Sequence, residues 1–374
     1  MSETVIVIGG GMAGVSAAAE LSEDFEVILL EKESFHGVHS TGRSAASYIP
    51  SYGHSDSSLR LLTALSKPAF DSQLEGLSDV PLLKARGLLT LRPAFNDNYA
   101  AELNQLCRYF PSIVAVENLR KELPSIPIKA DFATRGWFEP DATDIDVDAL
   151  LRAYLRKLKR NGGTVFTGIM IERIQNKRDS WAVTCGETTF NAAKLINCAG
   201  AWADDIAEMA GASHGHLTPK RRTAINFNVE IETKDWPLII AADESFYLKP
   251  DAGKLLASPV DATPSEACDS APEEFDIATA AYNVEQALAL TIKRIDHSWA
   301  GLRTFAKDGS PVIGEDPLMP NFYWLAGQGG HGIQIAPAAA QLLASLAADR
   351  PLPESFKREN FDPAWVSPAR LLTK

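Results

Sequence analysis

Three glycines and one acid near the start of the sequence have the spacing of a dinucleotide-binding site. Gly9, Gly11 and Gly14 follow a short apolar run, and Glu31 stands 22 positions after Gly9. Gly9 would permit a tight turn, Gly11 would let the backbone approach a pyrophosphate, and Gly14 would let a helix pack close to a strand. Glu31 can accept hydrogen bonds from ribose hydroxyls, and its charge would repel a 2′-phosphate. The pattern therefore predicts a nucleotide site that excludes a 2′-phosphate.

The elements that must position these residues are a strand, a helix and a second strand. The apolar run 5–8 predicts a buried strand, the alanine-rich run 15–21 a helix, and residues 25–30 a second buried strand. The helix would present free N–H groups and its positive dipole end to phosphates, with Met12 and Ala13 at that end. This unit fits NAD and FAD equally well.

The loop that follows favours FAD. Glycine, small hydroxylated residues and one arginine suit a loop that wraps phosphates, whereas a nicotinamide dehydrogenase would usually continue its strand–helix alternation there. A solvated serine-rich loop is the alternative interpretation. The residues predicted to bind the cofactor here are Lys32, Ser40, Thr41, Gly42, Arg43, Ser44, Ala45, Ala46 and Ser47.

Two later strand–glycine–helix units extend the same prediction. One lies at residues 193–203, after a β-rich stretch, and the other at residues 322–334. A helix start in the second unit would place a positive dipole against a reduced, negatively charged flavin. The predicted cofactor contacts from these regions are Ile171, Ala199, Gly200, Trp202, Gly329, Gly330, His331, Gly332, Ile333 and Gln334.

Units so far apart in the chain imply an α/β protein (α+β overall) with a discontinuous, Rossmann-like FAD-binding domain. We expect that domain at residues 1–80, 138–215 and 304–374, interleaved with a sheet-plus-helix substrate domain at residues 81–137 and 216–303. In the substrate domain, the patterns predict strands at 82–93, 222–231 and 246–259, helices at 96–109 and 116–123, and a surface loop at 261–274.

Composition limits the partners. The chain has 374 residues and a net charge of −12, which argues against nucleic acid or an anionic membrane surface as a partner. No apolar run is long enough to span a bilayer, so no integral membrane association is expected. Four cysteines without a Cys-x-x-Cys pair fit reduced thiols and a cytoplasmic protein. No metal is expected, because His214 and His216 lack further ligands.

The order of these segments resembles the D-amino-acid oxidase-type FAD-dependent oxidoreductase family, which includes glycine oxidase and sarcosine oxidase. Within it, residues 39–46 with Tyr52 downstream, residues 243–253 and residues 299–303 look closest to D-arginine dehydrogenase. The likeness runs essentially from end to end of the chain.

The resemblance implies a D-amino-acid dehydrogenase with non-covalent FAD. A hydride would pass from the substrate Cα to flavin N5, and the imino acid would hydrolyse to a 2-oxo acid and ammonia. The family pattern gives the catalytic positions to Tyr52, Tyr247 and Arg303, where the arginine holds the substrate carboxylate as a bidentate pair. Further substrate contacts expected from the resemblance are Leu88, Arg222, Leu238, Ile240 and Gly330. No cysteine follows Cys268, which argues against a covalent flavin link at the C-terminal segments.

Two departures from the D-arginine dehydrogenase pattern affect specificity. Leu88 stands where that enzyme has a glutamate for the substrate guanidinium, and Ser47 stands where it has a histidine. An unpaired cation beside Leu88 would be desolvated without compensation. We therefore expect a preference for apolar or neutral polar side chains.

Other functions remain open at this point. The same fold could serve an oxidase of glycine, sarcosine or another secondary amine, or a dehydrogenase of 2-hydroxy acids. A non-catalytic dinucleotide-binding redox sensor is the alternative outside enzymes. The expected partners are an amino acid and an electron acceptor, either a quinone or an unknown one.

Overall fold

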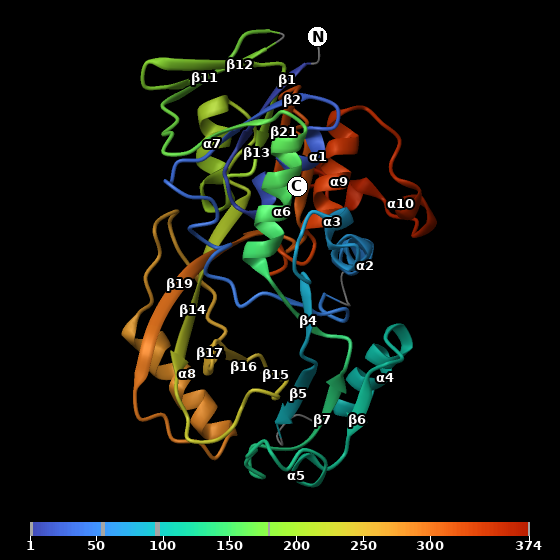
Figure 1. Ribbon diagram of the computed structural model, residues 1–374, viewed down its shortest axis with the longest axis vertical. Helices are drawn as coiled ribbons and strands as arrows, with labels where there is room; N and C mark the ends of the chain where they lie inside the picture. The colour runs from blue at the N-terminus through green and yellow to red at the C-terminus, as the bar shows by residue number, and fades with distance from the viewer. Residues whose placement is uncertain (1–2, 54–56, 94–97, 179, 373–374) are drawn as a thin grey trace.

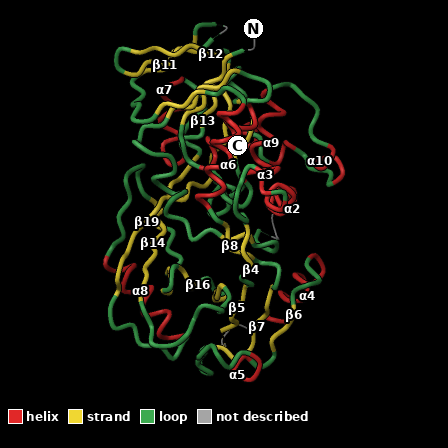
Figure 2. The backbone as a smooth tube through the Cα atoms, viewed as in Figure 1, coloured by secondary structure: helices red, strands yellow, loops and turns green. Residues whose placement is uncertain are grey.

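The computed structural model describes residues 3–53, 57–93, 98–178 and 180–372 (Figure 1). Two large sheets lie toward opposite ends of an elongated molecule, and the long strands β14 (Leu217–Phe227) and β19 (Ile295–Ala306) run side by side from one end toward the other, as Figure 2 shows. No helix in the described part of the chain has both the length and the apolar character to cross a membrane.

The first sheet has six strands in the order β20-β21-β13-β1-β2-β9. Their bounds are Thr4–Ile8 (β1), Glu26–Leu30 (β2), Thr164–Phe166 (β9), Lys194–Asn197 (β13), Val312–Glu315 (β20) and Phe322–Ala326 (β21). All neighbouring strands are parallel except β20 and β21. Parallel sheets are buried on both faces, which explains the unbroken apolar runs in β1 and β21. The predicted α/β fold class is confirmed.

Helices cover this sheet. Helix α1 (Met12–Leu21) packs against α6 (Val147–Arg160) and α9 (Ala336–Ala347) in one apolar core. The alanine-rich sequences of α1 and α9 allow the close approach, because alanine adds little bulk between helix axes. The other elements around this half are α2 (Ser57–Asp71), α3 (Gln73–Gly76), β10 (Arg173–Asn176), β11 (Trp181–Cys185), β12 (Thr188–Ala192), η1 (Gly200–Trp202), α7 (Ala203–Ala210), α10 (Glu354–Arg358), η2 (Pro363–Trp365) and η3 (Pro368–Leu371).

The second sheet runs in the order β18-β14-β17-β16-β15-β5-β7-β6, and β19 also pairs with β14. Its remaining strands are β5 (Leu88–Pro93), β6 (Val114–Val116), β7 (Ala133–Glu139), β15 (Leu238–Ala241), β16 (Tyr247–Asp251), β17 (Lys254–Ser258) and β18 (Thr263–Pro264). One face buries Leu89, Leu91 and Ile239 in a core with α8 (Glu274–Ala287). Because side chains alternate along a strand, Leu88 and Leu238 lie on the opposite face.

One predicted strand is interrupted, and one predicted helix is shorter than expected. The strand expected at 82–93 is split into β4 (Leu83–Ala85) and β5 by Gly87, which has a positive φ of 75°. The helix expected at 116–123 is shorter, because β6 (Val114–Val116) ends at Val116 and α5 (Leu119–Glu122) forms only a single turn. Pairing of β6 with β7 outweighed local helix propensity.

Other predicted elements shifted. The strand expected at 246–259 is a hairpin of β16 and β17, turning where Ala252 and Gly253 have positive φ. The strand expected at 222–231 is β14, and the expected loop 261–274 contributes β18, which pairs with β14. The helix expected at 96–109 is α4 (Tyr99–Tyr109); residues 96 and 97 lie outside the described part.

A small third sheet joins the two halves. Strand β8 (Thr143–Ile145) pairs with β3 (Ser47–Tyr48) on one side and with β4 on the other. Asp144 of β8 forms ion pairs with Arg86 at 2.7 Å and with Lys249 of β16 at 2.9 Å, all largely buried. The expected domain border at 137–138 thus falls inside β7, and the chain passes between the halves through a packed junction.

Candidate functional site

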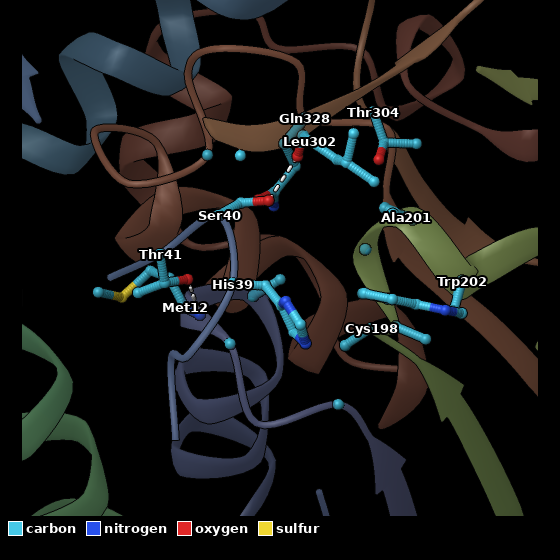
Figure 3. Close-up of a pocket in the computed structure, with 18 of the residues that line it drawn as sticks. Met12, His39, Ser40, Thr41, Cys198, Ala201, Trp202, Leu302, Thr304 and Gln328 are labelled. Atoms are coloured by element: carbon cyan, nitrogen blue, oxygen red, sulfur yellow. Dashed lines mark hydrogen bonds between the residues drawn. The ribbon is translucent and has the colours of Figure 1, made fainter. Parts of the chain in front are cut away.

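A cavity of about 370 Å³ lies between the first sheet and strands β14 and β19 (Figure 3). Its walls come from the turn between β1 and α1, the loop at residues 37–45, the segment following β13, strand β19 and the glycine-rich residues 327–333. The carboxyl ends of parallel strands meet at this edge, which is where ligands bind in open α/β sheets.

In the β1–α1 turn, a side chain at Gly9 or Gly14 would clash with neighbouring backbone atoms. Gly9 has a φ of +106°, and a Cβ there would lie 2.5 Å from the carbonyl oxygen of Cys198. A Cβ on Gly14 would lie 1.8 Å from the Gly9 oxygen. A Cβ on Gly11 would lie only 3.3 Å from the Thr41 hydroxyl oxygen, which is a tight contact with a side chain of the cavity lining. The turn therefore offers bare backbone to a ligand.

The start of α1 is open to an anion. The N-cap residue, Gly11, has no side chain with which to cap the helix, and the Met12 N–H donates to Thr41 Oγ1 at 2.9 Å. No acidic residue lies in that turn. The positive end of the helix dipole is thus available to phosphate groups.

Glu31 directly follows β2, and its side chain contacts the glycine turn. It is 8% exposed; its Oε2 accepts from the Gly10 N–H at 2.5 Å, and its Oε1 accepts from the Glu33 N–H at 2.8 Å. The carboxylate is thereby held at the position where the dinucleotide fingerprint requires a ribose-binding acid.

Two aromatic rings and a cation lie beside it. Lys32 Nζ is 3.2 Å from the centroid of the Trp202 ring, and the His39 ring centroid is 4.7 Å from the same ring. Trp202 and His39 both line the cavity. The two rings are tilted by 51° to each other, so they form an aromatic wall of the cavity rather than one flat surface.

At the β19 side of the cavity, two buried polar atoms lack partners. Thr304 Oγ1 and Gln328 Nε2 have no hydrogen-bond partner within the described residues, and both residues line the cavity (Figure 3). Buried polar atoms are almost always hydrogen-bonded, so these two point to a ligand with polar edge atoms. The heteroatoms of an isoalloxazine ring meet that requirement. Sequence reasoning missed both residues, although Gln328 lies within the glycine-rich unit 322–334.

Two arginines converge beside the glycine-rich segment. Arg222 lies on β14 and Arg303 on the adjacent β19, and a Cβ on Gly330 would lie 2.9 Å from Arg303 Nη1. Burial lowers the pKa of Arg222, and the charge of Arg303 lowers that pKa further, whereas Tyr247, Tyr52 and Asp261 oppose the shift. No carboxylate of the described chain forms an ion pair with Arg303. Arg222, in contrast, donates through Nε to the Asp261 carbonyl oxygen at 2.6 Å and lies 4.0 Å from the Asp261 carboxylate. Arg303 is therefore the cation of this pair that is available to a small anion.

The predicted side-chain contacts lie next to these arginines. Tyr52, Leu88, Leu238, Ile240 and Tyr247 belong to one apolar cluster. Strand pairing aligns Leu238 with Leu88 and Ile240 with Tyr247, so both pairs share a face of the sheet. The Tyr52 ring lies 4.4 Å from the His331 ring. The structure thus gathers residues from three distant parts of the sequence.

Most sequence-predicted cofactor residues line the cavity. They are Gly9, Gly11, Met12, Ala13, Glu31, Lys32, Ser40, Thr41, Arg43, Ser44, Ala45, Ile171, Ala199, Gly200, Trp202, Gly329, Gly330, Gly332 and Ile333, together with Arg222, Tyr247 and Arg303 from the substrate half. Those outside its lining are Gly14, Gly42, Ala46, Ser47, His331 and Gln334, with Tyr52, Leu88, Leu238 and Ile240.

Two of the expected cofactor contacts use their side chains elsewhere. The Arg43 guanidinium donates to the Ala300 oxygen at 2.9 Å and to Asp269 at 2.5 Å, so it fastens the loop to the substrate half rather than facing phosphates. Gln334 accepts from the Ile49 N–H at 3.2 Å and donates to the Thr63 hydroxyl at 3.0 Å. Both contacts join segments far apart in sequence, which local patterns do not reveal.

Several lining residues were not predicted. Ile8 and Leu30 end β1 and β2, and this position at the carboxyl edge of the sheet is the signal that could have found them. The others include Val38, Ile169, Met170, Cys198, Asp205, Ile206, Met209, Ala224 and Leu302. The described residues contain no group of three metal-ligating side chains.

Comparison with known proteins gives a consistent result. The model of the family described as FAD dependent oxidoreductase (DAO) matches residues 4–346. Glycine oxidase from Bacillus licheniformis is 24% identical over 369 residues, covering 95% of this chain and 96% of that protein. The crystal structure of glycine oxidase from Geobacillus kaustophilus is similar with a TM-score of 0.81 at 19% identity, over 98% of each chain. That of L-proline dehydrogenase from P. horikoshii gives 0.80 at 20% identity, over 96% of this chain and 98% of that one.

Proposed function

The chain belongs to the FAD-dependent oxidoreductase (DAO) family, and from this premise we propose that it is a dehydrogenase of D-amino acids with neutral side chains. FAD is its cofactor, and its reaction class is the oxidation of amino acids or amines. The observation that carries the proposal is the pair of arginines, Arg222 and Arg303, facing one end of the cofactor cavity beside Tyr247.

The arginines would hold the substrate by its carboxylate. A guanidinium and a carboxylate form a bidentate pair that fixes orientation as well as position. Gly330 leaves room for the Arg303 guanidinium to lie against the glycine-rich segment. Tyr247 and Tyr52 would add hydroxyl donors to the same carboxylate. Held this way, the substrate Cα would be presented to the cofactor with one face only, which is how a clamp selects one enantiomer.

Residues of the cofactor half position the acceptor. When bound, FAD supplies the two-electron acceptor for the hydride from Cα, and the imino acid would hydrolyse in water to a 2-oxo acid and ammonia. Gly9, Gly11 and the start of α1 would hold the pyrophosphate, and Glu31 the ribose. Thr304 and Gln328 would satisfy their unpaired polar atoms on the edge of the ring system.

The apolar cluster supports a neutral substrate side chain. Leu88, Leu238 and Ile240 offer no charge to a guanidinium or ammonium group. An acid does lie opposite Leu88, because Glu139 of β7 is its register partner. However, Glu139 is 1% exposed and both of its carboxyl oxygens accept from Ser51, so it is not free to pair with a substrate cation.

Replacement of Leu88 tests this side-chain assignment. We expect Leu88→Glu to raise the ratio of kcat/KM for D-lysine over D-leucine by about tenfold, since a charged hydrogen bond contributes ~1.5–3 kcal/mol. Leu88→Gln, which is polar but uncharged, is the matched control and should leave the ratio within about twofold. An unchanged ratio in both variants would remove Leu88 from the side-chain pocket.

Anaerobic mixing tests the whole proposal. The yellow holoprotein is mixed with single D- and L-amino acids, and bleaching of the flavin absorbance is followed. We expect bleaching by D-amino acids with neutral side chains and slow or no bleaching by their L-enantiomers. If D-arginine or D-lysine gave the highest kcat/KM, the proposed preference for neutral side chains would be contradicted. Bleaching by 2-hydroxy acids alone would favour a hydroxy-acid dehydrogenase. No bleaching by any compound tested would favour the redox sensor.

A second candidate function is an oxidase of glycine, sarcosine or another secondary amine. It is favoured by the glycine oxidase relative, which matches almost the full length of both chains. Oxygen uptake measured beside reduction of a soluble quinone or dye separates the two. The dehydrogenase requires fast dye reduction with little oxygen uptake, and the reverse result supports the oxidase.

We further expect non-covalent FAD and a cytoplasmic protein. The cavity-lining Cys198 is buried, and burial raises the pKa of its thiol well above the usual value, so it stays protonated and a poor nucleophile. Acid precipitation of the holoprotein should therefore release all its flavin into the supernatant. Flavin retained in the washed pellet would contradict this expectation. The four cysteines are unpaired in the structure, which suits a reducing compartment.

A further inference from the structure

A buried carboxyl group holds the backbone beside Tyr52. Glu139 ends strand β7 and is 1% exposed. Its Oε1 accepts from the Ser51 N–H at 3.0 Å, and its Oε2 accepts from the Ser51 hydroxyl at 2.5 Å. Since Ser51 directly precedes Tyr52, these two bonds fix the segment from which the tyrosine ring projects.

The anchor is rigid and the segment is held at both ends. Glu139 is paired in register with Leu88, so its side chain emerges on the same sheet face as the apolar cluster around Tyr247. At the other end, the Ile49 N–H donates to Gln334 Oε1 at 3.2 Å. The Tyr52 N–H then donates to the Ile49 oxygen at 3.1 Å, which closes the turn. Residues 49–52 are thus hydrogen-bonded to the second sheet through Glu139 and to the segment after β21 through Gln334.

Burial of the Glu139 carboxyl group costs desolvation free energy, which a buried apolar side chain at this position would not cost. Burial raises the pKa of Glu139, and Asp141 raises it further, while the bonds from Ser51 lower it. A carboxyl group without access to water destabilises a protein unless hydrogen bonds compensate. An apolar side chain would fill the same volume without that penalty. The presence of a carboxyl group at this buried position is therefore best explained by the two hydrogen bonds that it accepts from Ser51.

We propose that Glu139 is a positioning residue for Tyr52: by accepting both donors of Ser51, it sets the distance between the Tyr52 hydroxyl and the substrate carboxylate. The inference rests on the proposed function, because it requires Tyr52 to contact that carboxylate. Glu139 itself does not touch the substrate. Its effect should pass entirely through Tyr52.

A double-mutant cycle tests this dependence. We expect Glu139→Ala and Tyr52→Phe each to raise KM about tenfold with kcat changed less than about twofold, as for loss of binding common to ground and transition states. The double variant should also show about a tenfold increase rather than about a hundredfold one, because coupled residues are not additive. Glu139→Gln retains an acceptor for the Ser51 N–H and should restore KM to within about threefold of wild type.

A matched serine–carboxylate pair elsewhere provides the control. Asp316 is 3% exposed and accepts from both the Ser213 N–H and the Ser213 hydroxyl at 3.2 Å. Ser51→Ala and Ser213→Ala each remove one hydroxyl bond and should lower the Tm by a similar few degrees. Only Ser51→Ala should raise KM. Equal KM values for Ser51→Ala and wild type would overturn the proposal, as would additive effects of Glu139→Ala and Tyr52→Phe.

Binding of benzoate separates this inference from the proposed function. Benzoate carries a carboxylate but has no oxidisable Cα, and its Kd is measured from the perturbed flavin spectrum. If wild-type holoprotein is not reduced by any D-amino acid, the proposed function fails, yet the same cycle measured on benzoate Kd still tests Glu139. Non-additive Kd values support the positioning role and additive values overturn it. Should Glu139→Ala not fold, Ser51→Ala with Tyr52→Phe completes the cycle.

Discussion

Replacing Arg303 by methionine is expected to raise the KM for the amino-acid substrate by about a hundredfold or more. Methionine has a similar reach but no charge, and losing one partner of a desolvated, hydrogen-bonded charge pair costs about 2–5 kcal/mol. Arg222 would remain close by, but burial lowers its pKa, and its Nε already donates to the Asp261 carbonyl oxygen at 2.6 Å. Steady-state kinetics with the best D-amino acid measure the effect.

The control is a cation on the neighbouring strand. Lys220 of β14 is the register partner of Arg303, and its Nζ lies 5.0 Å from the Phe305 ring centroid rather than in the cavity lining. Lys220→Met removes one positive charge from the same region and should change KM by less than about twofold. If the two variants behave alike, the carboxylate is attracted by the general field and Arg303 is not its clamp.

Replacing Gly14 by alanine is expected to weaken FAD binding by about a hundredfold. The new Cβ would stand 1.8 Å from the Gly9 oxygen, so α1 and the glycine turn would have to move apart. Overpacking of this kind costs about 1–3 kcal/mol, and the displaced turn carries the backbone that faces the pyrophosphate. The flavin-to-protein absorbance ratio after dialysis, and FAD titration of the apoprotein, measure the loss.

A second glycine separates this effect from general instability. Gly253 has a φ of +80° in the β16–β17 hairpin, and a Cβ there would meet no atom within 4 Å. Gly253→Ala should cost about 1 kcal/mol of stability through backbone strain and leave the flavin content unchanged. A flavin loss as large as that of Gly14→Ala would mean that FAD content follows stability rather than the glycine turn.

Local sequence patterns predicted the nucleotide half well because its signals are local. The β1–turn–α1–β2 unit is specified by residues within one stretch, in which a Cβ on Gly14 would meet the backbone of Gly9. The α/β class and the family followed from that unit and its later repeats. The positions of Arg303 and Tyr247 were carried by resemblance rather than by any periodicity.

The contacts that sequence reasoning missed depend on register between distant strands. Nothing near Glu139 in sequence indicates Ser51, and nothing near Thr304 indicates that its hydroxyl would lack a partner. Gly87 divides a strand because a Cβ there would lie 2.5 Å from the Phe138 ring, which is a tertiary contact. The contacts of the Arg43 guanidinium were missed for the same reason: its partners, Asp269 and Ala300, are far from it in sequence.

The interleaving of the two halves has a consequence for how the chain folds during synthesis. Strand β1 is made first, but its sheet is completed only by β13, β21 and β20, and the Ile49–Gln334 hydrogen bond spans 285 residues. Contacts of such long range close slowly and late. Until β21 (Phe322–Ala326) has been synthesised, one edge of the apolar strand β13 has no partner, and unpaired strand edges favour aggregation. Cellular yield should therefore depend on chaperones and flavin supply more strongly than the stability of the finished enzyme would suggest.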